Sequence, residues 1–527
     1  MADRLFSTSW NFQGGFATDL ARQVRQLNYL KKAENALYEV SGAVRKVGGS
    51  ARVNVTAITG TPDVVGGYDF WLSGVGGSFT QKFVVVTGNG KVLKEDMDGV
   101  YDDITGTATI AADAVPVFAT FTDLLTIWFS TNNTPLKWNQ AGNVASLGGS
   151  PPTARTATVH VGRLWAAGAN ATPSRLYFGA LGNAEDWTGA DTGSIDVDPE
   201  DGDRIIGLAS HKGRLLVFKG PNKGSIHVIS GNTVATFSRT VLVTGIPLQS
   251  PNAIVPVGDD IWFMSDRGVH SISATERFGD FGVSDITRFL RGFFMNQLNR
   301  GRLDRVWGVN YAHKQCALWT LTRTGRVEND MAFGISYIRL PEEGPKPFTW
   351  IRECLCAAIR DNPASRIREV VFGSTDGFVL RQDVAARNLE GTDAYTFTIE
   401  TPAIIIAPND AQGKAVVDQP VQLYRMFMRS RPSTVATDIT VSVARDNESS
   451  ETYTFSQQGS GFILGTDRLG TGRLGGEDVR TVSADLVGEA RTIRMTITQG
   501  TLNQDANIEE IGVYWKPVAQ SGAAALA

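Results

Sequence analysis

The sequence contains few of the residues that build disulfide frameworks and metal sites. Of its 527 residues, three are cysteines and five are histidines. Three cysteines cannot form a disulfide scaffold, which fits synthesis in a reducing cytoplasm. No histidine belongs to an HxH or HExxH pattern, and neither a GxSxG elbow nor a GxxxxGK[ST] loop occurs. We therefore expect no enzymatic activity, no catalytic residues, no metal and no cofactor.

The sequence also lacks a strong charge of either sign and long apolar runs. Its formal net charge is −4 and its pI is about 5.9, which argues against tight binding to nucleic acid, because such binding depends on cationic side chains. No apolar run approaches the roughly 18 residues of a membrane span. The opening residues, MADRLFSTSW, lack the basic region and apolar core of a signal peptide. These features predict a protein that has no membrane span and is soluble when made.

Glycine, in contrast, is abundant. There are 56 glycines against 20 prolines, and the glycines concentrate between short apolar runs, where turns require backbone conformations that other residues rarely adopt. Hydrophobic residues make up 42% of the chain and charged residues 20%, both ordinary globular values. This composition indicates a β-rich globular protein, and its length predicts two or three domains.

A repeat organises the middle of the chain. Seven times a short apolar run, a turn containing Gly, Asn or Asp, and a second short apolar run recur at intervals of 40 to 56 residues. The first runs begin at Phe83, Leu124, Leu164, Leu215, Ile261, Ala317 and Val370. Repeats of this length are typical of β-propeller blades.

The second runs and the flanking sequence extend each copy to a meander. In one copy, a strand-like run over 205–209 leads through a short turn to Leu215, so three strands are expected in a row. One such sheet cannot bury both faces alone, but six or seven arranged radially can. We predict a six- to seven-bladed β-propeller over residues 65–385. The second runs are expected at 91–93, 136–138, 176–178, 226–229, 269–272, 326–327 and 378–380.

The two ends of the chain lack this repeat. Residues 1–64 are predicted to form an N-terminal arm that contacts an adaptor or a neighbouring subunit, with a solvated extension that packs on its own domain as the alternative. Five of its apolar residues fall near helical spacing and permit a short amphipathic helix or two broken ones: Leu20, Val24, Leu27, Ala33 and Leu37. Residues 386–527 show longer alternating runs, such as Ile493, Met495 and Ile497, which predict a C-terminal antiparallel β-sandwich. A further helix is expected within 286–298, behind the capping residues Ser284 and Asp285.

Three features could carry chemistry, and each has a plainer explanation. The acidic stretch 185–203 could hold Ca²⁺ through oxygen ligands, or it could be a solvated connection between blades. Cys354 and Cys356 lie two residues apart in a β-like run and are expected to be small core residues. Trp187 and Trp350 could stack on sugars, although aromatic residues in blades more often serve packing.

The opening segment resembles a bacteriophage family. The run 11–16 contains a Gly-Gly pair, residues 25–26 are Arg-Gln, and 42–46 reads Gly-Ala-Val-Arg-Lys, with Val47 where the family has proline. This pattern is similar to the start of the tail nozzle proteins, or tail tubular protein B family, of short-tailed, podovirus-type phages. The residues that the resemblance marks for assembly are Gly14, Gly15, Arg25, Arg45 and Lys46.

The middle of the chain adds to this resemblance. It contains Leu-Tyr-Phe-Gly at 176–179, Glu-Asp-Trp at 185–187, Gly-Asp-Arg-Ile-Ile-Gly-Leu at 202–208 and Leu-Leu-Val-Phe-Lys at 215–219. Phage tail propellers show phrases of this kind in this order. The order of the phrases therefore supports the same family as the opening segment.

The resemblance implies a structural virion protein. Six copies would form a ring below the phage adaptor, the head–tail connector protein, with tail fibre proteins as further partners, through a heterologous interface between neighbouring copies. The ring would retain packaged DNA and conduct double-stranded DNA during ejection without binding it specifically. The location implied is the tail of the virion, after synthesis in the cytoplasm of the host bacterium.

Two alternatives come from other classes of protein. One is a phage tail propeller that binds a receptor or a glycan, or that cleaves a glycan, because many propellers are glycosidases that use paired carboxylates. The Ser-Asp-Arg-Gly turn at 265–268 and the Ser-Thr-Asp-Gly turn at 374–377 lack the tryptophan of sialidase repeats. The other alternative is a cellular propeller that acts as a scaffold for protein partners.

Overall fold

The computed structural model describes residues 5–19, 28–73, 78–96, 99–272, 283–338, 343–362, 365–407, 419–431, 433, 435–446, 448–457 and 479–518. Its contacts divide the chain into two compact units, each described by itself. Unit 1 comprises Met1–Ser50, Ile335–Trp350 and Asp383–Ala527, and unit 2 comprises Ala51–Gly334 and Ile351–Gln382. The predicted division into 1–64, 65–385 and 386–527 stays a prediction.

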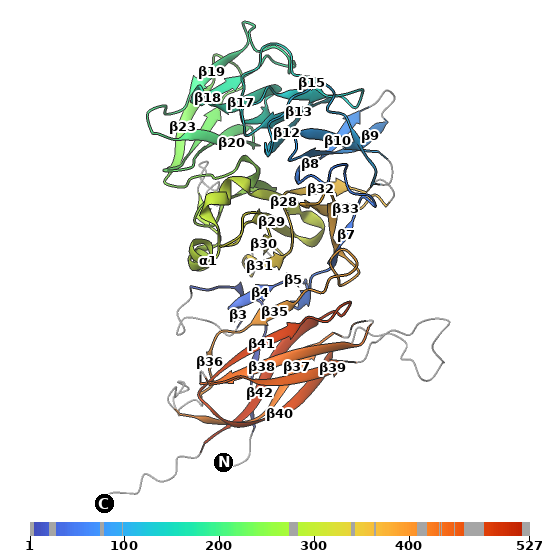
Figure 1. The fold of residues 1–527 in the computed structure, drawn as a ribbon. Coiled ribbons are helices and arrows are strands. Elements are labelled where there is room, and N and C mark those ends of the chain that lie inside the picture. The colour runs from blue at the N-terminus through green and yellow to red at the C-terminus, as the bar shows by residue number, and fades with distance from the viewer. Residues whose placement is uncertain are drawn as a thin grey trace, which may run out of the picture. The chain divides into compact units, whose positions relative to one another are not determined.

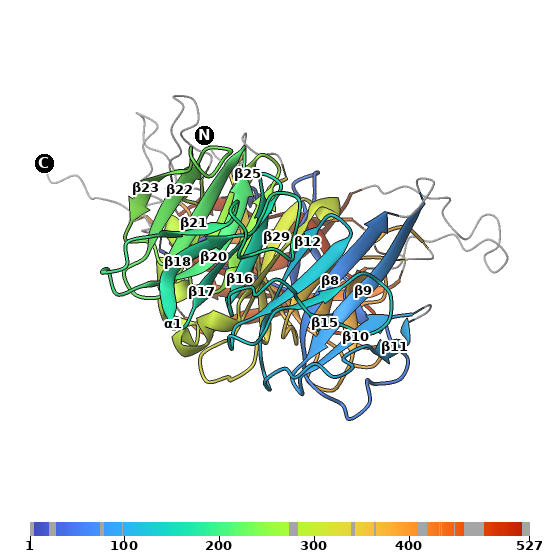
Figure 2. The same cartoon turned by 90° about the horizontal axis from the view of Figure 1, so that it is seen from above.

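Unit 2 is built from consecutive antiparallel meanders (Figures 1 and 2). The first two blades consist of β8 (Val64–Ser73), β9 (Phe79–Thr87), β10 (Lys91–Glu95) and β11 (Tyr101–Asp103), then β12 (Pro116–Phe121), β13 (Leu124–Phe129), β14 (Leu136–Trp138) and β15 (Ala145–Ser146). The next two consist of β16 (Thr156–His160), β17 (Arg163–Ala169), β18 (Thr172–Phe178) and β19 (Gly193–Asp196), then β20 (Arg204–His211), β21 (Arg214–Gly220), β22 (Ser225–Ser230) and β23 (Ser238–Thr244).

Three more blades complete the series. The fifth contains β24 (Ile254–Val257), β25 (Asp260–Met264), β26 (Val269–Ser271) and β27 (Ser284–Asp285). The sixth contains β28 (Trp307–Tyr311), β29 (Cys316–Leu321) and β30 (Met331–Ser336), and the seventh contains β32 (Ala357–Asp361), β33 (Arg368–Gly373) and β34 (Val379–Val384). The short helices are η3 (Pro251–Ala253), η5 (Arg288–Leu290), α1 (Arg291–Asn296), η6 (Arg300–Arg305) and η7 (Ala312–Lys314).

The seventh blade takes its last strand from the start of the chain. β7 (Gly49–Arg52) is followed by Val53 and Asn54, which run beside β34. The amide of Val53 donates to the carbonyl of Val379 at 2.8 Å, and the amide of Val379 donates to Oδ1 of Asn54 at 2.9 Å. The first residues of unit 2 therefore pair with its last strand, which closes the series of blades.

Apolar side chains fill the spaces between successive blades. One buried cluster joins residues of the first and second blades, including Phe70, Ile127 and Trp138. Similar clusters join the second blade to the third and the third to the fourth. Each sheet thus buries the face that it could not bury alone, and this burial is the main stabilising term of the architecture.

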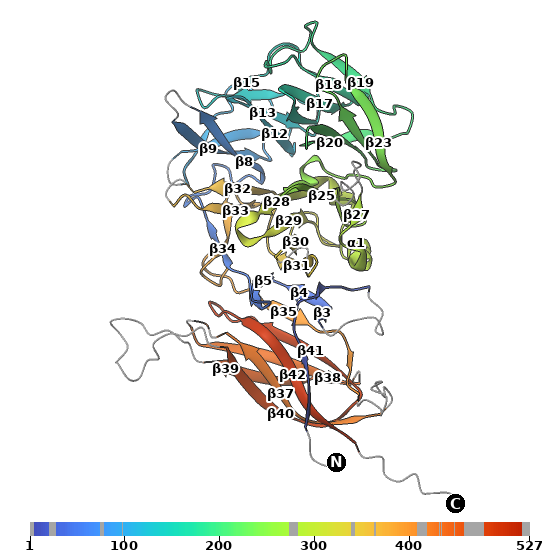
Figure 3. The same cartoon turned by 180° about the vertical axis from the view of Figure 1, so that it is seen from behind.

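The described residues of unit 1 form two larger sheets, antiparallel except where β31 pairs with β4, drawn in orange and red with some blue strands in Figures 1 and 3. The first runs in the order β40 (Arg480–Ala490), β37 (Val421–Ser430), β42 (Asn507–Pro517), β6 (Val44–Lys46) and β5 (Ala36–Tyr38), with β1 (Phe6–Trp10) also paired to β42. The second runs β39 (Glu451–Gln457), β38 (Thr437–Arg445), β41 (Thr492–Gln499), β35 (Phe397–Glu400), β4 (Lys32–Glu34) and β31 (Lys346–Ile351). β36 (Ile404–Ile405) pairs with β41, and β2 (Gly15–Phe16) pairs in parallel with β3 (Tyr29–Leu30).

The predicted fold class, an all-β propeller with an N-terminal arm and a C-terminal antiparallel sandwich, is confirmed. The seven predicted first runs lie in β9, β13, β17, β21, β25, β29 and β33, and the structure has seven blades. The second run of the sixth copy was placed wrongly at 326–327. The strand is β30, because Val327 lies in the turn and is 64% exposed.

Of the two predicted helices, one forms and the other does not form in the described residues. A six-residue helix, α1, forms within 286–298, and Phe293 and Phe294 are buried there. The helix suggested by residues 20–37 is wrong for the described part: residues 29–38 form β3, β4 and β5, with Ala33, Leu37 and Tyr38 buried. Ladder pairing of β4 with the distant β35 and of β5 with the nearby β6 prevails there over the helical spacing. Residues 20–27 lie outside the described residues.

Candidate functional site

An axial cavity of about 660 Å³ lies within unit 2. It is lined by residues from the innermost strands of all seven blades, β8, β12, β16, β20, β24, β28 and β32, several of which are labelled in Figure 1. Most of these residues are small or apolar, as the crowded axis of a propeller requires. The formally charged residues of the lining are Asp69, Asp361 and Arg368.

Asp69 and Asp361 are brought together by the first and seventh blades. Asp69 lies on β8, and its Oδ2 accepts hydrogen bonds from the indole Nε1 of Trp71 at 2.9 Å and from the amide of Asp361 at 3.4 Å. Gln81 donates from Nε2 to Oδ1 of Asp69 and, at 3.0 Å, to the carbonyl oxygen of Asp361. Gln81 therefore links the two acids across the meeting of the two blades.

The surroundings of the two carboxyl groups differ. The pKa of Asp69 is raised from 3.8 to about 6: burial is the main cause, the nearby charge of Asp361 contributes, and the hydrogen bonds from Gln81, Trp71 and the Asp361 amide oppose the shift. Asp361 is 3.2 Å from Nε of Arg368, whose side chain is 73% exposed. The site thus joins one buried carboxyl with a raised pKa and a second carboxyl that lies beside a guanidinium.

The same cavity presents aromatic rings and hydroxyl groups. Tyr68 and Phe118 stack with ring centroids 5.2 Å apart, and the Tyr68 hydroxyl is 2.9 Å from Oγ1 of Thr120. Trp71 and Trp307 also line the cavity. Flat apolar faces beside hydrogen-bonding groups suit ligands that have both apolar faces and hydroxyls.

Sequence reasoning missed this site. Asp69 and Asp361 are nearly three hundred residues apart, and no local motif connects them. The signal available was the acid itself: Asp69 interrupts an otherwise glycine-rich and aromatic strand, where a charged residue is unusual. Trp187 and Trp350, the aromatics considered for sugar stacking, lie elsewhere. Trp350 is fully buried, and Trp187 packs edge-on against Trp128.

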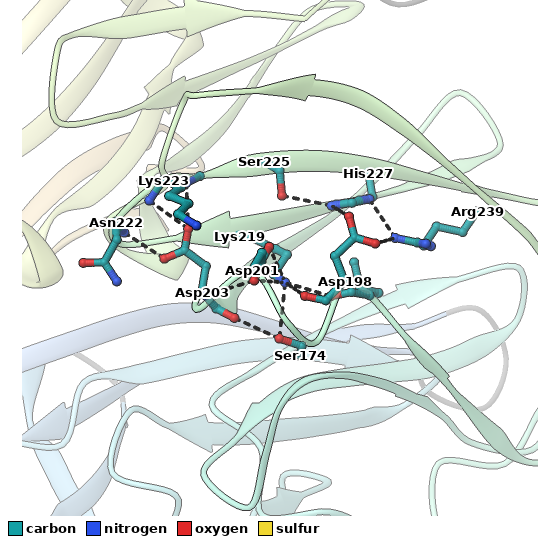
Figure 4. Close-up of polar contacts among 12 residues, drawn as sticks. Ser174, Asp198, Asp201, Asp203, Lys219, Asn222, Lys223, Ser225, His227 and Arg239 are labelled. Atoms are coloured by element: carbon teal, nitrogen blue, oxygen red, sulfur yellow. Dashed lines mark hydrogen bonds and ion pairs between the residues drawn. The ribbon is translucent and has the colours of Figure 1, made fainter.

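The acidic stretch 185–203 packs around the ammonium group of Lys219, a residue from the following blade (Figure 4). Lys219 on β21 is fully buried, and its Nζ donates to the carbonyl oxygens of Val197 and Asp198, each at 2.7 Å. It also donates to the Asp201 carboxylate at 2.7 Å and to Oγ of Ser174 at 3.2 Å. Carbonyl, carboxylate and hydroxyl oxygens are the ligands that Ca²⁺ prefers, and here they surround an ammonium group instead.

Asp203 and Asp198 of this stretch also have partners within the protein (Figure 4). The Asp203 carboxylate accepts hydrogen bonds from three consecutive backbone amides, those of Asn222, Lys223 and Gly224, at 2.7 to 2.9 Å. Asp198 pairs with Arg239. Among the described residues, no group of three or more His, Cys, Asp or Glu could hold a metal ion. The stretch is best explained as a connection between blades, clamped by Lys219.

A serine and a histidine beside Asp198 do not form a relay. Oγ of Ser225 is 2.9 Å from Nε2 of His227, and Asp198 approaches the same ring nitrogen at 3.7 Å. In a catalytic triad the carboxylate binds the other nitrogen, but Nδ1 of His227 faces Arg239 at 3.4 Å. Burial lowers the pKa of His227. The imidazole is therefore a neutral structural group.

The predicted assembly residues that the structure describes lie in unit 1. Gly15 has a φ of +72°, and a Cβ on Gly14 would come within 2.9 Å of the carbonyl oxygen of Asn28. Arg45 pairs with Glu39 at 3.4 Å and with Asp383 at 3.3 Å. All of these contacts hold the strands of unit 1 together. Arg25 lies outside the described residues.

Lys46 is the most deeply buried of these candidates. Its side chain is fully buried, and Nζ donates to Oε1 of Gln499 at 2.8 Å and lies 4.3 Å from the ring centroid of Tyr395. A contact of the predicted assembly residues with an adaptor or a neighbouring subunit stays a prediction.

In the described part of the chain, no helix is long and apolar enough to cross a membrane.

Comparisons with known proteins give structural neighbours only. No protein-family model and no curated protein matches the chain. Among solved structures, it is similar to the exo-β-1,3-galactanase of Phanerochaete chrysosporium, with 11% identity, 89% of this chain and 100% of that one covered, and a TM-score of 0.27. It is also similar to a chain described as a glycoside hydrolase (12%, 86% and 99%, 0.25) and to the extracellular domain of a putative hybrid two-component system of B. thetaiotaomicron (9%, 74% and 45%, 0.30).

These findings correct three predictions. The predicted function as a DNA-conducting tail nozzle and the predicted absence of enzymatic activity are not upheld, because the neighbours named above are glycoside hydrolases and the extracellular domain of a two-component system. The phage and tail terms of the prediction gain no support, whereas the β-propeller does. At these identities and TM-scores the likeness concerns fold alone. The case for a function therefore has to come from the residues of this chain.

Proposed function

We propose that this protein binds a carbohydrate in the axial cavity of unit 2 and that Asp69 and Asp361 act on a glycosidic bond there. The observation that carries the proposal is the pair of carboxyl groups in one cavity, one of them with a pKa raised to about 6. Cleavage of a glycosidic bond by a carboxyl pair needs one group that is protonated near neutral pH and one that is ionised.

Each acid has a role that its surroundings support. Asp69 is the candidate general acid, because burial and the Asp361 charge favour its protonated form, which can give its proton to the leaving oxygen. Asp361 is the candidate carboxylate partner, because its Oδ1 lies 3.2 Å from Nε of Arg368 and so beside a positive charge. The hydrogen bonds from Gln81 and Trp71 hold Asp69 in position.

The remaining lining suits a sugar. The rings of Tyr68, Trp71 and Trp307 offer apolar faces, on which the C–H groups of a sugar ring can pack. Hydroxyl groups in the lining come from Thr158 and Ser210. A volume of about 660 Å³ accepts a short oligosaccharide, since ligand cavities of roughly 300 to 1,000 Å³ take ligands of drug size.

The test combines a glycan array with a hydrolysis assay on bacterial surface polysaccharides. We expect the wild-type protein to bind and cleave one class of glycan. Asp69→Asn should lower kcat by about 100-fold or more while binding persists, because general acid catalysis contributes roughly 10² to 10⁴. Asp102→Asn, at an exposed residue paired with Lys94 on the outside of the first blade, is the matched control. Neither binding nor products across the panel would refute the proposal.

The resemblance of the opening residues supports two further proposals. One is that the chain belongs to the tail of a short-tailed phage, where a glycan cavity would meet the surface of the host. The other is that copies of the chain assemble into a ring with the phage adaptor protein, with tail fibre proteins as additional partners. The mass of the purified chain, measured alone and with the adaptor, tests the ring. A monomer under both conditions would refute it.

A further inference from the structure

A second, smaller cavity of unit 2 differs from the axial one in its chemistry. It has a volume of about 110 Å³, room for a few water molecules or one small polar ligand. Five charged side chains from four separate segments line it, three of them acidic and two basic: Asp63, Asp113, Glu328, Arg302 and Arg305.

The small cavity lies at the starts of the innermost strands, whereas the carboxyl pair of the axial cavity lies farther along them. The small cavity is lined by Val65 at the start of β8 and by Leu355 just before β32. Asp69 and Asp361 lie farther along the same two strands. Because the innermost strand of every blade of a propeller runs in the same direction, strand starts gather at one end of the axis. The small cavity is therefore separate from the carboxyl pair, although Trp307 lines both.

Buried hydrogen bonds fix the walls of the small cavity. Asn329 is 3% exposed, and its Nδ2 donates to the carbonyl oxygens of Arg305 at 2.9 Å and of Leu355 at 3.2 Å. Its Oδ1 accepts from the Thr322 hydroxyl at 2.7 Å. One side chain thus ties together η6, the segment before β32 and the turn that carries Glu328. A ligand would meet a cavity that is already formed, which lowers the cost of binding.

Tight backbone packing brings two of the acids together. The amide of Gly88 donates to the carbonyl of Asp63 at 2.7 Å, and its carbonyl accepts from the amide of Asp113 at 2.9 Å. A Cβ on Gly88 would lie 3.1 Å from Oδ1 of Asp113 and 3.2 Å from Cβ of Asp63. The basic side chains are placed as simply: Arg302 and Arg305 are three residues apart on η6, so they point to the same side of a 3₁₀ turn.

The five charges face one another without closing into pairs. Within the described residues, no ion pair joins any two of them. Burial raises the pKa of Asp63, with a further contribution from Asp113, and Arg305 opposes the shift. Burial also raises the pKa of Glu328, against the effect of Arg302. The acids therefore crowd one another while the guanidinium groups remain too far away to pair with them directly.

We propose that this cavity binds a small zwitterion. Its anionic group would lie against Arg302 and Arg305, and its ammonium group against Asp63, Asp113 and Glu328. A ligand with a negative charge alone would meet three carboxylates, and one with a positive charge alone would meet two guanidinium groups. The charged groups of a zwitterion would stabilise the five partly desolvated side chains better than the hydroxyl groups of a neutral ligand would. This proposal is independent of the glycan function, since it involves neither Asp69 nor Asp361.

Calorimetric titration of the full chain tests the proposal. The ligands are glycine, β-alanine, γ-aminobutyrate and 5-aminovalerate, which vary the distance between the two charges. Each is compared with the carboxylate and the amine of the same length. We expect at least one zwitterion to bind about tenfold or more tightly than either single-charge analogue, which corresponds to roughly 1.4 kcal/mol.

Variants assign the binding to this cavity. Arg305→Gln and Glu328→Gln should each weaken the best zwitterion about tenfold or more, the size expected for one lost charge-assisted contact. Two matched controls come from the same short helix. Arg300→Gln and Asp304→Asn should leave binding unchanged, because Arg300 pairs with Asp266 at 2.9 Å and Asp304 is exposed. A melting curve for each variant verifies folding.

Three outcomes would overturn the proposal. The first is equal binding of the zwitterion and a single-charge analogue. The second is binding of neutral glycerol or glucose at this cavity, sensitive to Glu328→Gln, without binding of any zwitterion. The third is no binding of any member of the series. None of these outcomes bears on the hydrolysis assay, so the two proposals can fail separately.

Discussion

At the scale of single residues, Asp69 links the proposed chemistry to stability. Its pKa is about 6 in the folded protein and 3.8 in the reference state. A carboxyl whose pKa is raised by folding adds stability below about pH 3.8 and loses that contribution as the pH rises through about 6. We expect the difference in unfolding free energy between wild type and Asp69→Asn to change by up to about 3 kcal/mol between pH 4 and pH 8. Urea unfolding across this range measures it.

The direction of the change is as informative as its size. The wild-type protein should lose stability relative to Asp69→Asn as the pH rises, since ionised Asp69 is the unfavourable form. Asp102→Asn, at an exposed carboxylate, should show a far smaller dependence on pH. If the difference between wild type and Asp69→Asn is flat across the range, the environment assigned to Asp69 is wrong.

The same residues show where prediction from sequence ends. Asp69 and Asp361 lie in strands of the first and the last blade, so only closure of the ring brings them together. Lys219 lies near the end of the apolar strand β21. Its sequence context gives no sign that it binds the acidic stretch about twenty residues earlier. Local motifs report chemistry that is contiguous in the chain. Both of these groups are assembled by pairing between distant strands.

At the scale of elements, Lys219 clamps the connection between β19 and β20 onto β21. Lys219→Met should lower stability by about 3 to 5 kcal/mol, because the partly buried Asp201 carboxylate and the carbonyls of Val197 and Asp198 would lose their shared, fully buried cation. EDTA should leave the melting temperature of the wild-type protein unchanged, because the cation belongs to the chain. Thermal unfolding measures both effects.

A control variant and an EDTA titration test this interpretation. Lys212→Met, at a lysine in the turn between β20 and β21, should cost far less than Lys219→Met, because surface lysines contribute little. A marked drop in melting temperature on adding EDTA to the wild-type protein would mean that a metal ion, and not Lys219, holds the stretch 197–203.

The elements also explain which parts of the fold were predictable. The seven first runs were found because each blade is a local meander, whose strands are neighbours in sequence as well as in space. The last strand of the seventh blade was not found, because Val53 and Asn54 pair with residues more than three hundred positions later. Within 29–38, β4 was mistaken for part of a helix for the same reason, because its partner β35 is distant in sequence. The partner of β5 is the nearby β6, so there the helical spacing was simply misleading.

At the scale of the whole molecule, the sequence predicted architecture better than function. Repeats determine the propeller, and the alternation in Ile493, Met495 and Ile497 determines a half-buried strand of the sandwich. A propeller, however, supports many functions, so its fold does not choose between a conduit and a binding site. That choice depends on which side chains reach the axis, and the seven innermost strands show a carboxyl pair there.

Closure of the seven blades depends on the meeting of the first and the last. Apolar clusters join the first four blades to one another, but here a buried ion network is added: Arg360 of β32 pairs with Glu95 of β10 and, at 3.2 Å, with Glu369 of β33. Removing the Arg360 guanidinium would leave the buried carboxylates of Glu95 and Glu369 without this cationic partner. Arg360→Leu should therefore lower the unfolding free energy by about 3 to 5 kcal/mol.

A double variant separates the pair from the packing. Arg360→Leu with Glu95→Leu should recover much of the loss, because apolar residues of similar size can replace a buried ion pair, and Glu369 retains Arg381 at 3.1 Å. Arg368→Leu, at a largely exposed residue, is the control and should change stability by less than about 1 kcal/mol. Urea unfolding measures all three. If Arg360→Leu costs no more than the control, the ion network does not hold the first and seventh blades together.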